Sequence, residues 1–237
     1  MGRSLARAAE LAGIEVRLGG GDDPGAPCRG AGGALLCVPD GAIAEVCSRI
    51  GPDAPPLVGH VSGATTLAAL DAIAEHGGSA FSLHPLQTFT DGETPVGGTP
   101  AAIAGSDDRA LGFARGLAGA LGMRPFEVRD GDRAAYHAAA AVASNLLVAL
   151  EESAADLLER TGIEDARELL APLVLRTAAN WVEHGPAALT GPIARGDRVT
   201  VERHRDAIAE TAPELLPVYD VLAARARAIV QGSGVSG

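Results

Sequence analysis

The sequence contains no lysine, and all 19 basic residues among its 237 are arginines. Schiff-base chemistry on a lysine, and phosphate-binding loops that end in a lysine, are therefore excluded. The chain has 30 acidic residues and a net charge of −11. Because affinity for a nucleic-acid backbone depends on clustered positive charge, this balance argues against DNA or RNA as a partner.

Cysteine is also scarce, with only Cys28, Cys37 and Cys47 and no Cys-x-x-Cys pair. An odd number at this spacing fits neither a disulfide framework nor a zinc site, so we expect three buried thiols and no metal. The most apolar stretch, residues 134–150, is short and interrupted by polar residues. Without a basic and apolar leader segment, we expect a cytoplasmic protein with no membrane partner.

The first half alternates short apolar runs with helical patterns, which is typical of a parallel sheet covered by helices. The runs predict strands at 14–18, 34–38, 57–61, 80–83, 101–104 and 125–128. Helices are predicted at 2–11, 41–49, 65–76 and 106–121. We therefore predict an α/β fold for residues 1–130, a Rossmann-like, doubly wound parallel sheet.

Strand-like runs disappear after about residue 130, where long Ala, Leu, Glu and Arg segments follow one another. These segments predict helices at 132–160, 165–181, 198–211 and 214–230. Residues 131–230 are thus predicted to form a second, all-helical domain. The Gly/Ser-rich residues 231–237 are predicted to be a disordered tail.

The amino terminus resembles the end of a Gly-x-Gly-x-x-Gly dinucleotide fingerprint, with Gly2 as its third glycine. One hypothesis is that the start codon lies downstream of a missing first strand, and the alternative is an ordinary amphipathic helix. About twenty residues later, Asp22 or Asp23 stands where an acidic residue would meet a ribose hydroxyl. A solvated turn is an equal alternative for these aspartates.

Ligands of open α/β sheets bind beyond the carboxyl ends of the strands. Val38 ends one predicted strand, and Pro39 and Asp40 follow it in a turn along which the backbone of a nucleotide could pass. Asp40 is also a candidate helix cap. Ser62 and Gly63 follow the next strand and allow a ring or sugar to approach closely, although Ser62 could instead cap the following helix.

His84 ends a third predicted strand and is followed by a proline, which restricts it to an extended conformation. Such a histidine is a rigid proton carrier with a pKa near 6.5, and the alternative is a structural histidine bonded to a loop carbonyl. In an unbroken helix, Ser144 would lie within about 20° of His137 and Asn145 about 80° from it. The three could then face one cleft, or form a polar network inside helix packing.

The segment Thr-Gly-Pro-Ile-Ala-Arg-Gly-Asp at 190–197 separates two predicted helices. Arg195 could bind a carboxylate with two parallel hydrogen bonds. Equally, Asp197 could cap the next helix and pair with Arg195.

Five motifs in order carry a family resemblance: VPD at 38–40, HVSG at 60–63, SLHPLQTF at 82–89, YHAAAAVASN at 136–145 and TGPIARGD at 190–197. The sequence resembles the Rossmann-like proteins with a carboxyl-terminal domain of unknown function 2520, in the 6-phosphogluconate dehydrogenase-like and ketopantoate reductase-like group. The resemblance implies an NAD(P)-binding domain, a helical domain with a role in dimerisation, and an oxidoreductase using NADP or NAD.

Relatives in the larger group suggest roles by analogy. Prephenate dehydrogenases carry a serine at a strand end and then a His-Pro loop, which Ser62 and His84 match, and their histidine accepts the proton as hydride leaves. Asn145 matches an asparagine of β-hydroxyacid dehydrogenases, whose lysine one turn earlier is Ala141 here. The resemblance then leaves His84 or His137 to carry the proton.

We therefore expect an NAD(P)-dependent reductase or dehydrogenase for a small hydroxy or keto acid, bound between the domains of a homodimer. The rival hypothesis is a non-catalytic dinucleotide-binding, sensor or assembly protein. The residues expected to be catalytic are His84, His137, Asn145 and Ser62. Those expected to bind cofactor are Gly2, Asp22, Val38, Pro39, Asp40, Ser62 and Gly63, and those expected to bind substrate are Gln87, Ser144, Thr190 and Arg195.

Overall fold

The computed structural model describes residues 1–20 and 23–233, and contacts divide the chain into two compact units. The first unit is Met1–Ser144 and the second begins at Asn145. The division therefore falls after the helix that begins at Arg133, whereas the sequence suggested a boundary near residue 130.

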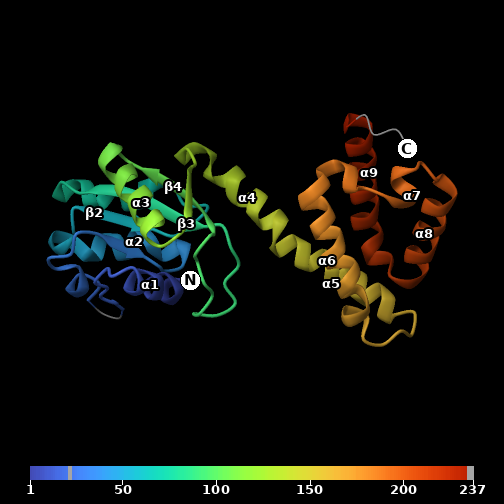
Figure 1. Ribbon diagram of the computed structural model, residues 1–237, viewed down its shortest axis with the longest axis horizontal. Coiled ribbons are helices and arrows are strands. Elements are labelled where there is room, and N and C mark those ends of the chain that lie inside the picture. The colour runs from blue at the N-terminus through green and yellow to red at the C-terminus, as the bar shows by residue number, and fades with distance from the viewer. Residues whose placement is uncertain (21–22, 234–237) are drawn as a thin grey trace. The chain divides into compact units, whose positions relative to one another are not determined.

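The first unit is built on five strands with helices between them (Figure 1). The strands are β1 (Ala34–Leu36), β2 (Leu57–His60), β3 (Ser79–Pro85), β4 (Pro100–Gly105) and β5 (Arg124–Glu127). The α-helices are α1 (Gly2–Leu11), α2 (Ile43–Ile50), α3 (Asp108–Ala120) and α4 (Arg133–Ala143). Short 3₁₀ helices are η1 (Ala26–Cys28), η2 (Asp40–Ala42), η3 (Gly51–Asp53), η4 (Leu67–His76) and η5 (Asp130–Asp132).

The sheet is mostly parallel, with the strands in the order β1-β2-β3-β4-β5. Only the β3–β4 pair is antiparallel, which corrects the prediction of a wholly parallel sheet. No crossover helix separates these two strands, so the chain returns in the opposite direction, whereas α3 carries it back to place β5 parallel to β4.

Helices cover both faces of the sheet because its strands alternate apolar side chains between the faces. In β3, Phe81 points into a core cluster that α1 and α3 complete, whereas Ala80 points into a second cluster formed with α2 and η4. The even-numbered positions of β3 therefore share the α2 face. Ser82 and His84 follow Ala80 on that face, towards the strand's carboxyl end.

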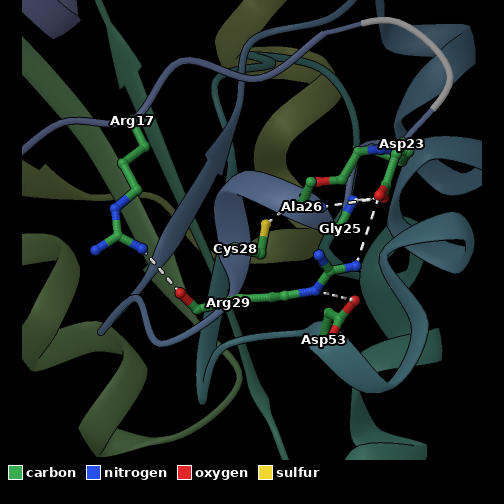
Figure 2. A network of polar contacts seen from close by, with 8 residues as sticks. Arg17, Asp23, Gly25, Ala26, Cys28, Arg29 and Asp53 are labelled. Atoms are coloured by element: carbon green, nitrogen blue, oxygen red, sulfur yellow. Dashed lines mark hydrogen bonds and ion pairs between the residues drawn. The ribbon is translucent and has the colours of Figure 1, made fainter.

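The segment 14–18 was predicted to be a strand but is irregular in the structure. The Arg17 guanidinium binds the carboxylate of Glu15. It also donates to the Arg29 carbonyl at 2.8 Å, and Arg29 pairs with Asp53 at 3.0 Å (Figure 2). Side-chain contacts therefore hold this loop in place of strand pairing. Asp23 accepts hydrogen bonds from the amides of the turn that follows it.

The described part of the second unit consists of helices and the turns between them, as predicted. Its helices are α5 (Asn145–Glu159), α6 (Ala166–His184), α7 (Gly191–Ala194), α8 (Arg198–Thr211) and α9 (Leu216–Ser233), with 3₁₀ turns η6 (Gly185–Ala188) and η7 (Pro213–Leu215). Residues 231–233 extend α9, so that part of the predicted disordered tail is helical. Arg160, which follows α5, binds Glu214 of η7 at 2.5 Å. Arg205 of α8 binds Asp220 of α9 at 2.8 Å.

Many large apolar side chains of the second unit are exposed to solvent. They include Leu146, Val148, Leu169, Leu173, Leu175, Trp181, Val182 and Val221. Within the helical stretch Asp130–Glu159, 18 consecutive residues have a mean hydropathy of 1.2, and 6% of this segment is buried. By length and composition alone, the stretch could cross a membrane. Its helix is interrupted at Ser144, where φ is −130° and ψ −80°.

Two of the three cysteines, Cys28 and Cys47, are buried free thiols as predicted. Cys37 is exposed at the end of β1, so the prediction that all three are buried is wrong. In the described ranges, no group of three His, Cys, Asp or Glu side chains could hold a metal ion.

Candidate active site

His84, Tyr136 and His137 meet over Gly63 in the first unit. Nδ1 of His84 lies 2.7 Å from the Tyr136 hydroxyl, and the His84 and His137 ring centroids are 6.0 Å apart. A Cβ on Gly63 would come 2.5 Å from Cδ2 of His137 and 3.0 Å from Nε2 of His84. Only glycine therefore lets both rings approach this point, where β2 and β3 end.

Arg133 lies behind these rings with a side chain that is 1% exposed. Its guanidinium donates to Oγ of Ser82 at 2.7 Å and to the carbonyl oxygen of Ser62. Its Nε has no hydrogen-bond partner among the described residues. One buried cation thus joins the first turn of α4 to the carboxyl ends of β2 and β3.

The environment of His84 favours the neutral ring. Burial, followed by the charges of His137 and Arg133, lowers the pKa of His84 from 6.5 to about 4, against the opposing effect of Asp40. The expected pKa near 6.5 is therefore wrong, because a strand-end position did not reveal the buried cation beside the ring. Burial also raises the pKa of Tyr136 to about 12, so its hydroxyl keeps its proton at neutral pH.

A third histidine, His60, is completely buried in β2, in register with Ser82 of β3. Its ring nitrogens have no hydrogen-bond partner of good geometry in the described part of the chain. Burial and the Arg133 charge lower the pKa of His60 to about 4. The site therefore contains two neutral histidines, His60 and His84, near one arginine.

The hydroxyl of Ser62 is engaged with the protein rather than directed to a ligand. It accepts from the amide of Thr65 at 2.9 Å and donates to the carboxylate of Asp40 at 2.8 Å. The alternative role as a cap of the following turn is thus the one that the contacts favour. Asp40 is the first residue of η2, and no side-chain hydrogen bond caps this helix. The prediction that Asp40 is a helix cap is therefore wrong.

Gln87 is bonded within the loop that follows β3. Its Oε1 accepts from the hydroxyl of Thr99 at 2.5 Å, and its Nε2 donates to the carbonyl oxygen of Pro95 at 2.9 Å. Both ends of the amide are therefore used to shape the loop, although we predicted that Gln87 contacts substrate.

The predicted alignment of His137, Ser144 and Asn145 on one helix face is wrong, because α4 ends before Ser144. Ser144 donates instead to the carbonyl oxygen of Ala140 at 2.8 Å. Asn145 is exposed at the start of α5 in the second unit. Thr190 and Arg195 are also exposed residues of that unit.

The contacts of Asp197 confirm that it caps α8. Its carboxylate accepts from the amide of Thr200 at 3.0 Å and from its hydroxyl at 2.7 Å. The nearby Arg195 contributes to the lowered pKa of Asp197, after the two bonds from Thr200.

Several predicted cofactor residues lie around the carboxyl end of β1. A Cβ on Gly2 would come 2.9 Å from Cβ of Cys37, so the first turn of α1 packs against the residue that follows β1. Val38 is half-buried beside this point, and Pro39 is exposed. Asp22 lies outside the described residues.

Sequence reasoning missed Arg133 and Tyr136 as members of the site. The signal was present in their spacing, because positions i, i+3 and i+4 place Arg133, Tyr136 and His137 on one face of α4. A polar face in the first turns of an otherwise alanine-rich helix indicates that this face meets a polar cluster.

A family model described as a domain of unknown function (DUF2520) matches residues 99–226. No curated protein sequence matches the chain.

Three solved structures illustrate the similarity of fold. A protein assigned provisionally as an NADP oxidoreductase, from Bacteroides fragilis, is 21% identical, with 95% of this chain and 93% of that chain covered and a TM-score of 0.78. A protein from Thermotoga maritima is 24% identical, with 84% and 78% covered and a TM-score of 0.72. An imine reductase from Streptomyces aurantiacus is 16% identical, with 99% and 96% covered and a TM-score of 0.67. These likenesses confirm the Rossmann-like fold with a helical carboxyl-terminal part.

Proposed function

This chain belongs to the DUF2520 family, and from that premise we propose that it is an NAD(P)-dependent oxidoreductase acting on a small hydroxy or keto acid. The observation that carries the proposal is the convergence of His84, His137 and Tyr136 over Gly63. They meet at the carboxyl ends of β2 and β3, where such folds bind ligands. The names of proteins with similar folds, among them an NADP oxidoreductase and imine reductases, support the same class of reaction.

The residues at this edge fit a nicotinamide dinucleotide. The close packing of Gly2 against Cys37 is what the third glycine of a dinucleotide fingerprint permits. Val38, Pro39, Asp40 and Gly63 would line the cofactor's path, and Ser62 would hold Asp40 in place. When bound, the nicotinamide supplies or accepts the hydride.

His84 would contact the reacting oxygen through Nε2, because Nδ1 is bound to Tyr136. A neutral imidazole N–H can polarise a carbonyl without first becoming charged. His137 lies beside it and is the second candidate for contact with the substrate. Arg133 is buried, and its positive charge helps to lower the pKa of His84.

Fluorescence titration with NADPH and NADH, followed by NADPH oxidation with a panel of small keto acids, tests the proposal. We expect binding and turnover, and at least a tenfold lower kcat/KM in His84→Gln. The exposed His76→Gln is the matched control and should leave turnover unchanged. Dinucleotide binding without turnover of any keto acid would favour the non-catalytic rival, and no binding at all contradicts both.

We also propose that the second unit pairs with a second copy of the chain. It exposes many large apolar side chains, and large exposed apolar patches mark interaction surfaces. Light scattering after size exclusion should give twice the mass of 23.8 kDa. Leu173→Glu with Val182→Glu should shift the mass towards the monomer, whereas the exposed Arg203→Glu should not. A wild-type monomer at all concentrations contradicts this pairing.

A further inference from the structure

The pairing of Tyr136 with His84 restricts where the histidine carries its proton. In the described part of the chain, the Tyr136 hydroxyl has one hydrogen-bond partner, Nδ1 of His84 at 2.7 Å. A hydroxyl has one proton to donate, and the lone pair on Nδ1 is the protein acceptor within reach. When Nδ1 accepts, a neutral imidazole must carry its proton on Nε2.

The charges around His84 come from three elements. Arg133 and His137 face it from α4, His60 from β2 and Asp40 from the turn after β1. Asp40 is the one carboxylate among them, and it accepts from the hydroxyl of Ser62. Burial, and after it the positive charge of Arg133, disfavour a proton on the His84 ring. The same buried surroundings disfavour a cationic group beside Nε2.

We propose that Tyr136 is a positioning residue that donates to Nδ1 of His84 and holds the proton on Nε2, so that the site takes the uncharged carbonyl group of a substrate rather than an iminium cation. This inference rests on the proposed function. A carbonyl oxygen accepts the Nε2 hydrogen bond, whereas an iminium has no lone pair to accept it.

The reduction balances without a charged histidine. The carbonyl carbon gains hydride from the reduced nicotinamide dinucleotide, the π electron pair moves to oxygen, and water supplies the proton that completes the alcohol. The Nε2–H bond stabilises the developing negative charge on oxygen and stays intact. Tyr136 acts only through His84, since its hydroxyl is committed to Nδ1.

Long-range ¹H–¹⁵N spectra of the histidine rings test the tautomer directly, because they distinguish the two neutral forms and the imidazolium. At neutral pH we expect His84 to be protonated on Nε2 in the wild type. In Tyr136→Phe, which keeps the ring packed on Phe126, the form protonated on Nδ1 should appear. A wild-type His84 that is an imidazolium or carries its proton on Nδ1 overturns the proposal, as does an unchanged tautomer in the variant.

The chain contains a matched control. In the second unit, Nδ1 of His204 lies 2.9 Å from the hydroxyl of Tyr219, in an exposed position. Tyr219→Phe removes a hydroxyl from a similar pair and should leave the His84 spectrum unchanged. A change at His84 in this variant would show that the effect of Tyr136→Phe is not local.

Titration of the ¹⁵N-labelled protein with 2-oxobutyrate or with pyrrolidinium, each with and without NADP⁺, tests the substrate class. We expect the keto acid to shift the Nε2 resonance of His84 and the cation to leave it in place. A response to pyrrolidinium, or none to the keto acid, overturns this part. Absence of NADPH oxidation alongside the expected spectra contradicts the proposed function and leaves the role of Tyr136 standing.

Discussion

The guanidinium of Arg133 donates to Oγ of Ser82 across 51 positions of sequence, and both side chains are buried. The same guanidinium reaches the carbonyl oxygen of Ser62. Two strand ends and the start of a helix are therefore tied to one cation, next to the histidines whose protonation it disfavours.

Replacing Arg133 by Gln should destabilise the first unit and raise the pKa of His84 and His60. The change leaves buried partners at Ser82 and Ser62 unsatisfied, which should lower the free energy of unfolding by about 2–4 kcal/mol. Removing the positive charge makes each imidazolium less unfavourable. Urea unfolding and NMR titration measure the two effects.

Arg109→Gln is the control for that variant, because Arg109 is exposed on α3. It should change the free energy of unfolding by no more than about 0.5 kcal/mol. Equal destabilisation by the two substitutions would contradict the structural role of Arg133.

Gly63→Ala should displace both histidine rings. The added Cβ would lie 2.5 Å from Cδ2 of His137, which no side chain tolerates without movement. We expect at least a tenfold loss of kcat/KM, measured by NADPH oxidation. Gly112→Ala is the control, since a Cβ there meets nothing within 4 Å and alanine favours the helix. Wild-type turnover in Gly63→Ala would refute the described geometry.

Ser62→Ala should act on stability more than on chemistry. Its hydroxyl caps the turn at Thr65 and binds Asp40, so its loss should lower the free energy of unfolding by about 1–2 kcal/mol. The loss of kcat should be smaller than that in His84→Gln. A loss as large as that of His84→Gln, in a protein of unchanged stability, would instead assign Ser62 to the reacting oxygen.

Lowering the pH should destabilise the protein at pH values above those at which most carboxylates take up a proton. His60 has its pKa lowered from 6.5 to about 4 by burial and by Arg133, so the folded state keeps it neutral. The unfolded state binds the proton first, and the free energy of unfolding therefore falls as pH drops from 6.5 towards 4. For His60 the full effect is on the order of 3 kcal/mol, and the shift at His84 acts in the same direction.

Urea unfolding at pH 7.5, 6 and 5 measures this dependence. NMR titration of His60 gives its folded pKa without a substitution, and His76, which is exposed on η4, serves as the internal reference. Constant stability across this range, or a His60 pKa equal to that of His76, would contradict the neutral buried state.

Local patterns predicted most elements. The helices Gly2–Leu11 and Arg198–Thr211 have the bounds that their sequence patterns indicated. Five of the six predicted strands are present, and in β2, β3 and β4 the short apolar runs are buried in the covered sheet. The segment 14–18 had a similar pattern, yet Arg17 engages the Arg29 carbonyl and the segment remains irregular.

Part of the candidate site was also predictable. His84 is one of the last two residues of β3 and Gly63 follows β2, and the ends of strands can be recognised in the sequence. The orientation of Ser144 could not be predicted, because it depends on α4 ending at Ala143, one residue before Ser144. The neutrality of His84 was hidden as well, since it depends first on burial and then on charges that include the distant Arg133.

Most elements of this protein, their order and the absence of lysine chemistry can be read from the amino-acid sequence, because side-chain periodicity and composition act over a few neighbouring residues. The contact of Tyr136 with His84, and the burial of Arg133 between Ser62 and Ser82, follow from the tertiary fold alone. These pairings depend on how α4 packs against the ends of β2 and β3. That packing is set by the burial of many residues at once, and no local pattern contains it.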